Sequence, residues 1–125
     1  MLPRKYKLKR DNDFKKVFKQ GRYCRGNFIR IKFLRNSLEF SRFAFIVGLK
    51  ISKKAVQRNK TRRQLEKATQ LVFNQISAKG ETSPLQGGKT SFDLVIMVQP
   101  EIIRKEYQEI EEELINLFKK IKPIN

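Results

Sequence analysis

The stretch that most constrains the fold is residues 92–98, which are apolar at every position except Asp93. A run of this length suits a β-strand and is far shorter than the roughly 20 residues of a membrane span. A strand that is apolar at successive positions has both faces covered, so we expect it to lie in the centre of a sheet. Pro100 follows the strand and predicts its end.

Two further strands are predicted upstream. Residues 28–34 alternate apolar and cationic side chains, which is typical of a strand with one wet face, and Arg30 and Lys32 then point to the same side. Residues 42–49 form a more apolar strand that can continue to residue 51. We expect an antiparallel hairpin between these two strands. Residues 22–27 are interpreted as a basic connection.

A short helix is predicted near the N-terminus, with Asp11 as its N-cap and Gly21 as its stop. Phe14, Val17 and Phe18 recur on one of its faces at the helical spacing. Core packing and stacking against unpaired nucleic-acid bases explain the two phenylalanine rings equally well at this point.

A longer helix is predicted over residues 54–76, with Ser52 as a cap. One of its faces carries apolar or small side chains, namely Thr61, Leu65, Ala68, Val72 and Ile76. The remaining surface carries mostly cations, namely Arg58, Asn59, Arg62, Arg63 and Lys67. One face is therefore suited to a core and the other to an anionic partner.

The C-terminal segment predicts an amphipathic helix. Its apolar stripe comprises Ile103, Tyr107, Ile110, Leu114, Leu117, Phe118 and Ile121. Its acidic residues are expected to form a solvated outer face, namely Glu106, Glu109, Glu111, Glu112 and Glu113.

The order helix-strand-strand-helix-strand-helix predicts an α/β (α+β) two-layer sandwich, with helices against one face of a small sheet. The opposite sheet face should be partly open and carry the basic residues of the first strand. We expect one domain over residues 1–125, with a basic, extended arm at 1–10. Residues 78–91 are rich in Gly, Pro, Ser and Lys and predict a mobile loop.

The charge is strongly uneven along the chain. The whole sequence has a net charge of +17, and residues 1–67 hold 22 Lys and Arg against 4 Asp and Glu, whereas residues 68–125 hold 7 against 8. A general solubility coat would not divide in this way. The pattern predicts a polyanionic partner, and nucleic acid before membrane.

The residue inventory argues against a protein active site. The chain has no His, which removes the commonest general base and zinc ligand, and its basic half has only four carboxylates. Cys24 is the single cysteine, so no internal disulfide can form. No secretory signal and no membrane span are visible, and a cytoplasmic location is expected.

Several blocks of the sequence resemble the protein subunit of bacterial ribonuclease P. Residues 53–63 contain Lys-Lys-Ala-Val and then Arg-Asn-Lys-Thr-Arg-Arg, which resembles the arginine-rich signature of that family. Residues 7–21 resemble its N-terminal block, residues 47–54 the strand that leads to the basic helix, and residues 93–100 its last strand. The blocks occur in the family's order and cover essentially the whole chain.

The resemblance implies a ribonucleoprotein that removes the 5′ leader of precursor tRNA, an endoribonuclease whose catalyst is RNA with bound Mg²⁺. The implied partners are the catalytic RNA, with one protein per RNA, and precursor tRNA. A left-handed crossover between parallel strands is also implied, against the general rule. The residues implied to face the catalytic RNA are Lys53, Lys54, Arg58, Asn59, Lys60, Arg62, Arg63 and Lys67. The candidate contacts of the leader are Phe14 and Phe18 by the resemblance, with Arg30, Lys32, Lys50 and Ser52 added from strand parity and motif position.

The sequence departs from the family pattern at three places. Lys60 stands where the signature has an arginine, Glu66 stands at its last arginine, and the loop at 78–91 is long. Lys67 is a candidate replacement for the contact at Glu66. The alternative function is that of a non-enzymatic RNA-binding module, such as a ribosomal protein or an RNA chaperone.

Overall fold

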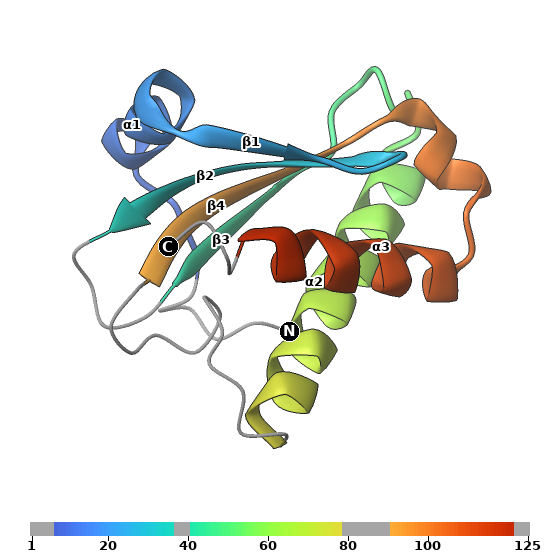
Figure 1. Ribbon diagram of the computed structural model, residues 1–125. Helices are drawn as coiled ribbons and strands as arrows, with labels where there is room; N and C mark the ends of the chain where they lie inside the picture. The colour runs from blue at the N-terminus through green and yellow to red at the C-terminus, as the bar shows by residue number, and fades with distance from the viewer. Residues whose placement is uncertain (1–6, 37–40, 79–90, 122–125) are drawn as a thin grey trace.

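The computed structural model describes residues 7–36, 41–78 and 91–121 of the 125-residue chain. A four-stranded mixed sheet in the order β1-β2-β4-β3 forms its centre, with helices on both faces (Figure 1). The elements in chain order are α1 (Asp11–Gln20), β1 (Arg22–Arg25), β2 (Ile29–Asn36), β3 (Arg42–Ile46), α2 (Ala55–Ala78), β4 (Ser91–Val98), the 3₁₀ helix η2 (Pro100–Arg104) and α3 (Tyr107–Ile121).

The apolar strand β4 lies inside the sheet, as its sequence predicts. It pairs with β2 in antiparallel and with β3 in parallel orientation, and residues 92–96 are all buried. The expected hairpin between β2 and β3 is therefore wrong, because β4 separates them. Being apolar on both faces, β4 is the strand that gains most from a neighbour on each side.

The parallel strands β3 and β4 are joined through α2, so the crossover that the resemblance implies is present. The left-handed sense of this connection stays a prediction. Residues 79–90, the main part of the expected mobile loop, lie outside the described residues. None of the helices in the described ranges is long and apolar enough to cross a membrane.

The segment interpreted as a basic connection forms the edge strand β1. It pairs antiparallel with β2, with Tyr23 opposite Lys32 and Arg25 opposite Arg30. Cys24 alone among its four residues is buried, and its Sγ donates to the carbonyl of Leu117 at 3.8 Å. A strand with one buried position in four shows no apolar alternation, which explains why the sequence did not predict it.

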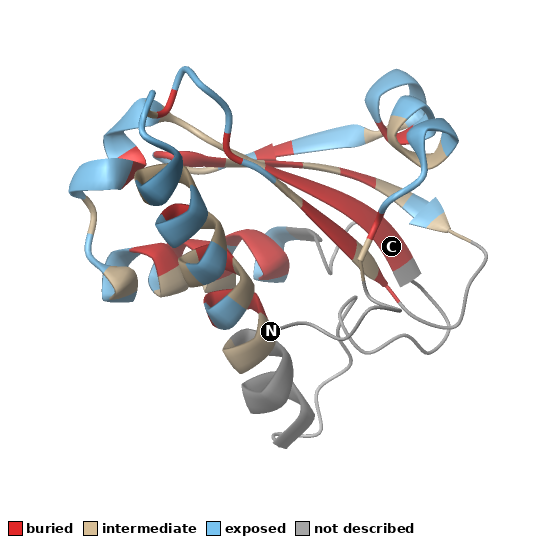
Figure 2. Cartoon of the chain, turned by 180° about the vertical axis from the view of Figure 1, so that it is seen from behind, coloured by how far each residue is buried: buried red, intermediate tan, exposed pale blue. Residues whose placement is uncertain are grey.

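The two faces of the sheet are covered by different helices. The larger core cluster lies between the sheet and the helices α2 and α3, and Figure 2 shows the buried residues gathered there and in the central strands. On the opposite face α1 places Val17, which is fully buried, against Ala44 and Val95. The expectation that all helices cover one face is thus wrong for α1, because the second apolar face of β4 also needs cover.

The C-terminal stripe begins later than expected. Ile103 lies in η2 and is 37% exposed, whereas its neighbour Ile102 is 2% exposed and joins the core. A 3₁₀ helix has three residues per turn, so Ile102 rather than Ile103 turns inward here. The remaining core contacts of this segment come from α3, through Ile110, Leu114, Leu117 and Phe118.

Glu113 is a buried carboxylate and does not belong to the solvated face on which it was expected. Its two oxygens accept hydrogen bonds from the backbone N–H groups of Asn27, Phe28 and Ile29 at 2.8, 2.9 and 2.7 Å. These groups lie in the turn between β1 and β2 and at the first residue of β2. Glu113 therefore fixes the β1–β2 hairpin to α3.

The N-terminal arm is attached to the sheet over its described residues. Leu8 is buried and its N–H donates to the carbonyl of Phe43 at 2.7 Å, while Lys7 forms a parallel bridge with Phe43. Lys9 and Arg10 are exposed, and residues 1–6 of the expected arm lie outside the described residues. Arg10, and not Asp11, occupies the N-cap position of α1.

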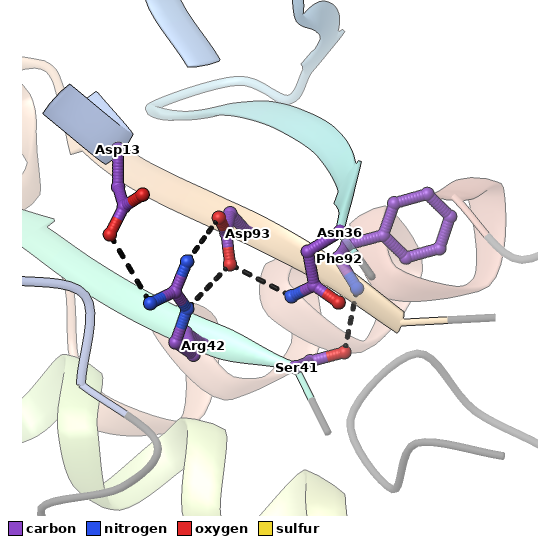
Figure 3. Close-up of polar contacts among 6 residues, drawn as sticks. All are labelled: Asp13, Asn36, Ser41, Arg42, Phe92 and Asp93. Atoms are coloured by element: carbon purple, nitrogen blue, oxygen red, sulfur yellow. Dashed lines mark hydrogen bonds and ion pairs between the residues drawn. The ribbon is translucent and has the colours of Figure 1, made fainter. Parts of the chain in front are cut away.

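Arg42 joins α1 to the sheet. Its guanidinium donates to both carboxylate oxygens of Asp93 on β4, at 2.8 and 2.7 Å, and forms an ion pair with Asp13 on α1 at 3.2 Å (Figure 3). Asn36 donates to the same carboxylate at 2.8 Å. The hydrogen bonds with Asp93 are the main cause of a raised pKa of Arg42. The network orients α1 across the strands.

Candidate nucleic-acid interface

The sheet face under α1 carries cations in a regular arrangement. Arg30 and Lys32 on β2 point to this face, as their parity predicts, because Ile29, Ile31 and Phe33 fill the core on the other face. Strand pairing places Arg25 and Tyr23 beside them on β1. With the two rings of α1, the two cations of β2 form what we call the sheet surface, which comprises Phe14, Phe18, Arg30 and Lys32.

Lys32 lies between two aromatic rings. Its Nζ is 5.6 Å from the ring centre of Phe18 and 4.9 Å from that of Tyr23. It also donates a hydrogen bond to the backbone carbonyl of Phe18 in the last turn of α1. A cation in this place is favoured by the helix dipole and by both rings. Lys32 thus holds the end of α1 and both rings in fixed positions.

Arg30 is held by a residue that sequence reasoning missed. The side-chain amide of Gln99 forms its hydrogen bonds when its oxygen faces the guanidinium of Arg30. In this orientation the oxygen accepts hydrogen bonds from Nε of Arg30 at 2.9 Å and from Nη2 of Arg30. The backbone N–H of Gln99 in turn donates to the carbonyl of Phe28 at 2.9 Å. The guanidinium of Arg30 is therefore oriented before any ligand binds.

Phe14 and Phe18 differ although they share one helix face. Phe14 is partly buried and packs with Leu34 and Met97 around the small core under α1. Phe18 is 39% exposed and its contacts include the ammonium of Lys32. The core-packing interpretation therefore suits Phe14 in part, and Phe18 presents the more accessible ring.

A cleft of about 500 Å³ lies along the other flank of α1. It is lined by Arg10, Asp13, Lys16, Gln20, Leu34, Arg35, Asn36, Arg42 and Asp93. Asp13, Lys16 and Gln20 share one flank of α1. Phe14 and Phe18 lie on the other flank, because each residue turns the helix by about 100°. The cleft is thus separate from the sheet surface.

The basic part of α2 forms a second cationic area on the opposite side of the sheet. We call it the helix surface; it comprises Lys53, Lys54, Arg58, Asn59, Lys60, Arg62, Arg63 and Lys67. All are exposed except Arg58 and Arg62, which are half-buried. The first turn of α2 has no acidic residue. Cations at a helix N-terminus oppose the helix dipole, so this arrangement favours an external anion.

Intramolecular partners orient part of the helix surface. Arg58 Nη1 donates to the carbonyl of Ser52 at 2.9 Å, and Arg62 Nη1 donates to Oδ1 of Asn59 at 3.1 Å. Among the residues that the structure describes, ion pairs with carboxylates occur only at Arg42. Glu66, which departs from the family pattern, thus forms no ion pair with the cations around it.

Three predicted residues lie apart from their expected partners. Ser52 accepts from the N–H of Lys54 at 3.1 Å and donates to Gln57, so it belongs to the start of α2 and not to the rings of α1. Lys50 is exposed in the turn before it. Lys67 extends toward α3, with its Nζ 5.2 Å from the ring centre of Tyr107.

The described residues do not fit a magnesium site of the protein's own. No three carboxylate, cysteine or histidine side chains gather within the described ranges. The two carboxylates that share a partner, Asp13 and Asp93, are both bound by the guanidinium of Arg42, which occupies the oxygens a hard cation would need. The described side chains are therefore not suited to bind a catalytic Mg²⁺ ion by themselves.

Comparison with known proteins gives consistent matches. The Ribonuclease P family model matches residues 2–122. The ribonuclease P protein component of Pseudanabaena sp. is 30% identical over 100% of this chain and 98% of the relative, and that of Alkaliphilus metalliredigens is 30% identical over 95% and 96%.

The fold of this chain matches solved structures of RNase P proteins. The protein from Thermotoga maritima superimposes with a TM-score of 0.70 at 27% identity, covering 90% of this chain and 97% of that one. A mutant of the Staphylococcus aureus protein gives a TM-score of 0.76 at 18% identity, covering 94% of this chain and 89% of that one. No match favours the alternative of a ribosomal protein or RNA chaperone. Because a family model covers almost the whole chain and near-full-length relatives reach 30% identity, the chain belongs to the ribonuclease P protein family.

Proposed function

We propose that this protein, as the protein component of the endoribonuclease ribonuclease P, binds its two RNA ligands with two different surfaces. The helix surface docks onto the catalytic RNA, and the sheet surface holds the single-stranded 5′ leader of precursor tRNA. The observation that carries the proposal is the separation of two basic areas across the sheet, of which the sheet surface combines its cations with the exposed ring of Phe18.

The chemistry of the helix surface suits a folded RNA. Its side chains are mainly exposed cations without carboxylate partners among the described residues, and arginine can contact phosphate through two N–H groups. Such contacts release counterions and depend steeply on salt. Asn59 adds an amide that can donate to or accept from a ribose or base edge. Arg58, Lys60, Arg62 and Arg63 are the cations we assign to this contact, with Lys53, Lys54 and Lys67 at its margin.

The chemistry of the sheet surface suits an unpaired strand. Phe18 is an exposed ring, with Phe14 beside it, and Arg30 and Lys32 supply positive charge at fixed positions. Stacking on an aromatic ring contributes on the order of 1–3 kcal/mol per base and accepts any base. This tolerance fits leaders that differ between tRNAs. Lys50 and Ser52 lie before α2 and apart from these rings, so they could contact the leader only where it continues beyond the sheet surface.

The proposed function also concerns substrate affinity, Mg²⁺ binding, stoichiometry and location. The protein increases the affinity for substrate, and the Mg²⁺ ions that serve cleavage are bound mainly by the catalytic RNA and the substrate. One helix surface per chain fits one protein per RNA. We propose a cytoplasmic location, because the proposed RNA partner and substrate would be found there.

Reconstitution tests the proposal. The protein is mixed with a bacterial ribonuclease P RNA, and cleavage of precursor tRNA is measured at low Mg²⁺. We expect stimulation over the RNA alone and tighter binding of precursor tRNA than of mature tRNA. Stimulation without any preference for the leader would refute the role of the sheet surface, and no stimulation with any bacterial RNA would refute the docking role.

A further inference from the structure

The outer side of β1 carries two residues that the proposed function does not use. Tyr23 is 56% exposed, and Arg25, two residues further along the strand, is also exposed. Both point to the face of Arg30 and Lys32, because Cys24 between them is buried against the helix α3. An exposed ring on an edge strand makes no contribution to the core that would explain it.

The pairing of β1 with β2 creates an uncompensated pair of cations. Arg25 lies directly opposite Arg30, and like charges in such cross-strand pairs destabilise a sheet. Within the described part of the chain neither arginine forms an ion pair with a carboxylate. Arg30 is also oriented by Gln99. A phosphate between the two guanidinium groups would remove the repulsion and accept hydrogen bonds from both.

Tyr23 continues the row of rings that begins on α1. The ammonium of Lys32 lies 5.6 Å from the ring centre of Phe18 and 4.9 Å from that of Tyr23, so one cation has an aromatic ring within reach on each of two elements. Alternating rings and cations along one strip match the alternating bases and phosphates of a single strand.

We propose that Tyr23 and Arg25 bind one further nucleotide of the single-stranded leader, with its base stacked on Tyr23 and a phosphate between Arg25 and Arg30. This inference rests on the proposed function, since it extends the same strip beyond Phe18. Lys32 is a positioning residue in this arrangement: its ammonium is already bound by the carbonyl of Phe18 and keeps both rings in place.

The test uses holoenzyme reconstituted with a bacterial ribonuclease P RNA and precursor tRNAs whose leaders grow by one nucleotide at a time. Tyr23→Ala should remove the gain in affinity at one step of the series, a loss of about 5- to 30-fold, and leave shorter leaders and mature tRNA unchanged. Tyr23→Phe should retain the gain because the ring remains. Tyr23→Leu, which keeps the bulk over Lys32 but has no flat ring, should behave like Tyr23→Ala.

Arg25 has a matched control on its own strand. Arg25→Ala should weaken long-leader binding by about 3- to 10-fold and lower the salt slope by about 0.7, the value for one phosphate of a single strand. Arg22→Ala removes the same charge from the same strand, but its side chain points to the opposite face, so it should have no effect on the leader series.

The outcomes distinguish a failure of this inference from a failure of the proposed function. If Phe18→Ala weakens leader binding and Tyr23→Ala does not, the inference is wrong and the proposed function stands. If neither variant affects the leader series, the proposed function itself fails. A loss that is equal at all leader lengths, or a Tyr23→Leu variant that behaves like wild type, would show that Tyr23 only supports the strand.

Discussion

The sheet surface and the helix surface are both cationic but are built differently. On the sheet surface, Lys32 and Arg30 are each held by partners within the protein, namely the Phe18 carbonyl and Gln99. On the helix surface, Lys60 and Arg63 are exposed, and side-chain hydrogen bonds within the described residues involve Arg58, Arg62 and Asn59. The first surface is therefore fixed before binding, whereas the second retains side-chain freedom.

This difference would allow one small protein to bind the two proposed RNA ligands. A fixed surface loses little conformational entropy on binding and can hold a flexible strand in one path. Long, free cations adapt to the phosphates of an RNA that is already folded, and they act mainly through charge. The two surfaces should consequently differ in salt dependence, in the ligand they affect and in the response to mutation.

The largest expected effect concerns the helix surface. The double variant Arg62→Ala/Arg63→Ala should weaken docking to a bacterial ribonuclease P RNA by about 2–3 kcal/mol, because two charge-assisted contacts are lost. The slope of log affinity against log salt should fall by about 1.5–2. Binding isotherms at several salt concentrations measure both quantities.

The matched control is Lys119→Ala/Lys120→Ala, which removes two exposed cations from the end of α3. It should leave docking nearly unchanged. An equal loss in both double variants would mean that net charge, and not the helix surface, determines the affinity, and the comparison of the two surfaces would then fail.

The second expected effect tests what fixes the sheet surface. Arg42→Met leaves Asp93, which is 6% exposed, and Asp13 without their cation, and should destabilise the protein by about 2 kcal/mol. Urea unfolding measures this loss. Since Arg42 orients α1, leader binding should weaken along with stability, while docking of the catalytic RNA should remain.

Adding Asp93→Asn to Arg42→Met supplies the control. It removes the buried unpaired charge and should restore part of the stability. No recovery would show that the loss at Arg42 comes from packing alone.

The third effect separates the two phenylalanines. Phe18→Ala should reduce the affinity for leader-bearing tRNA by about 1–2 kcal/mol with little loss of stability, because its ring is 39% exposed. Phe14→Ala should also destabilise the fold, since its ring packs on the core under α1. Leader binding and urea unfolding of both variants measure the split. Equal losses for precursor and mature tRNA would assign both rings to the core.

The sequence predicted the parts of this comparison that depend on local pattern. The position of β4, the extent of α2 and the common side of Arg30 and Lys32 followed from periodicity. Tyr23 was missed, because β1 is too short and too exposed for a strand pattern, although an aromatic residue between cations was a usable signal. The place of β4 between β2 and β3, and the burial of Glu113 under a hairpin far away in sequence, depend on long-range pairing that no local pattern encodes.

The fourth effect tests the hairpin that carries Tyr23 and Arg25. Glu113→Gln replaces one of two accepting oxygens by an amide NH₂ group, which cannot accept from the backbone N–H groups it meets. The expected loss of stability is about 1 kcal/mol. Glu112→Gln, at an exposed neighbouring position, is the control and should be neutral. Equal stabilities for the two variants would remove Glu113 as the anchor of the sheet surface.

The smallest expected effect reports whether the sheet surface is fixed in the free protein. Cys24 lies on the back of β1, behind the strip of Tyr23 and Arg25, and burial raises the pKa of its thiol above the ordinary 9.0. Alkylation of the folded protein at neutral pH should therefore be very slow and should follow unfolding.

The raised pKa of the Cys24 thiol also makes the stability of the protein depend on pH. Below the ordinary thiol pKa both states keep the proton, and as pH rises above it the unfolded state loses the proton first, so stability falls until the folded pKa is passed. Cys24→Ala should lack this alkaline loss when urea unfolding is compared at pH values on either side of 9.0. Rapid alkylation of the native protein would mean that β1 detaches readily, and the sheet surface would then be as adaptable as the helix surface.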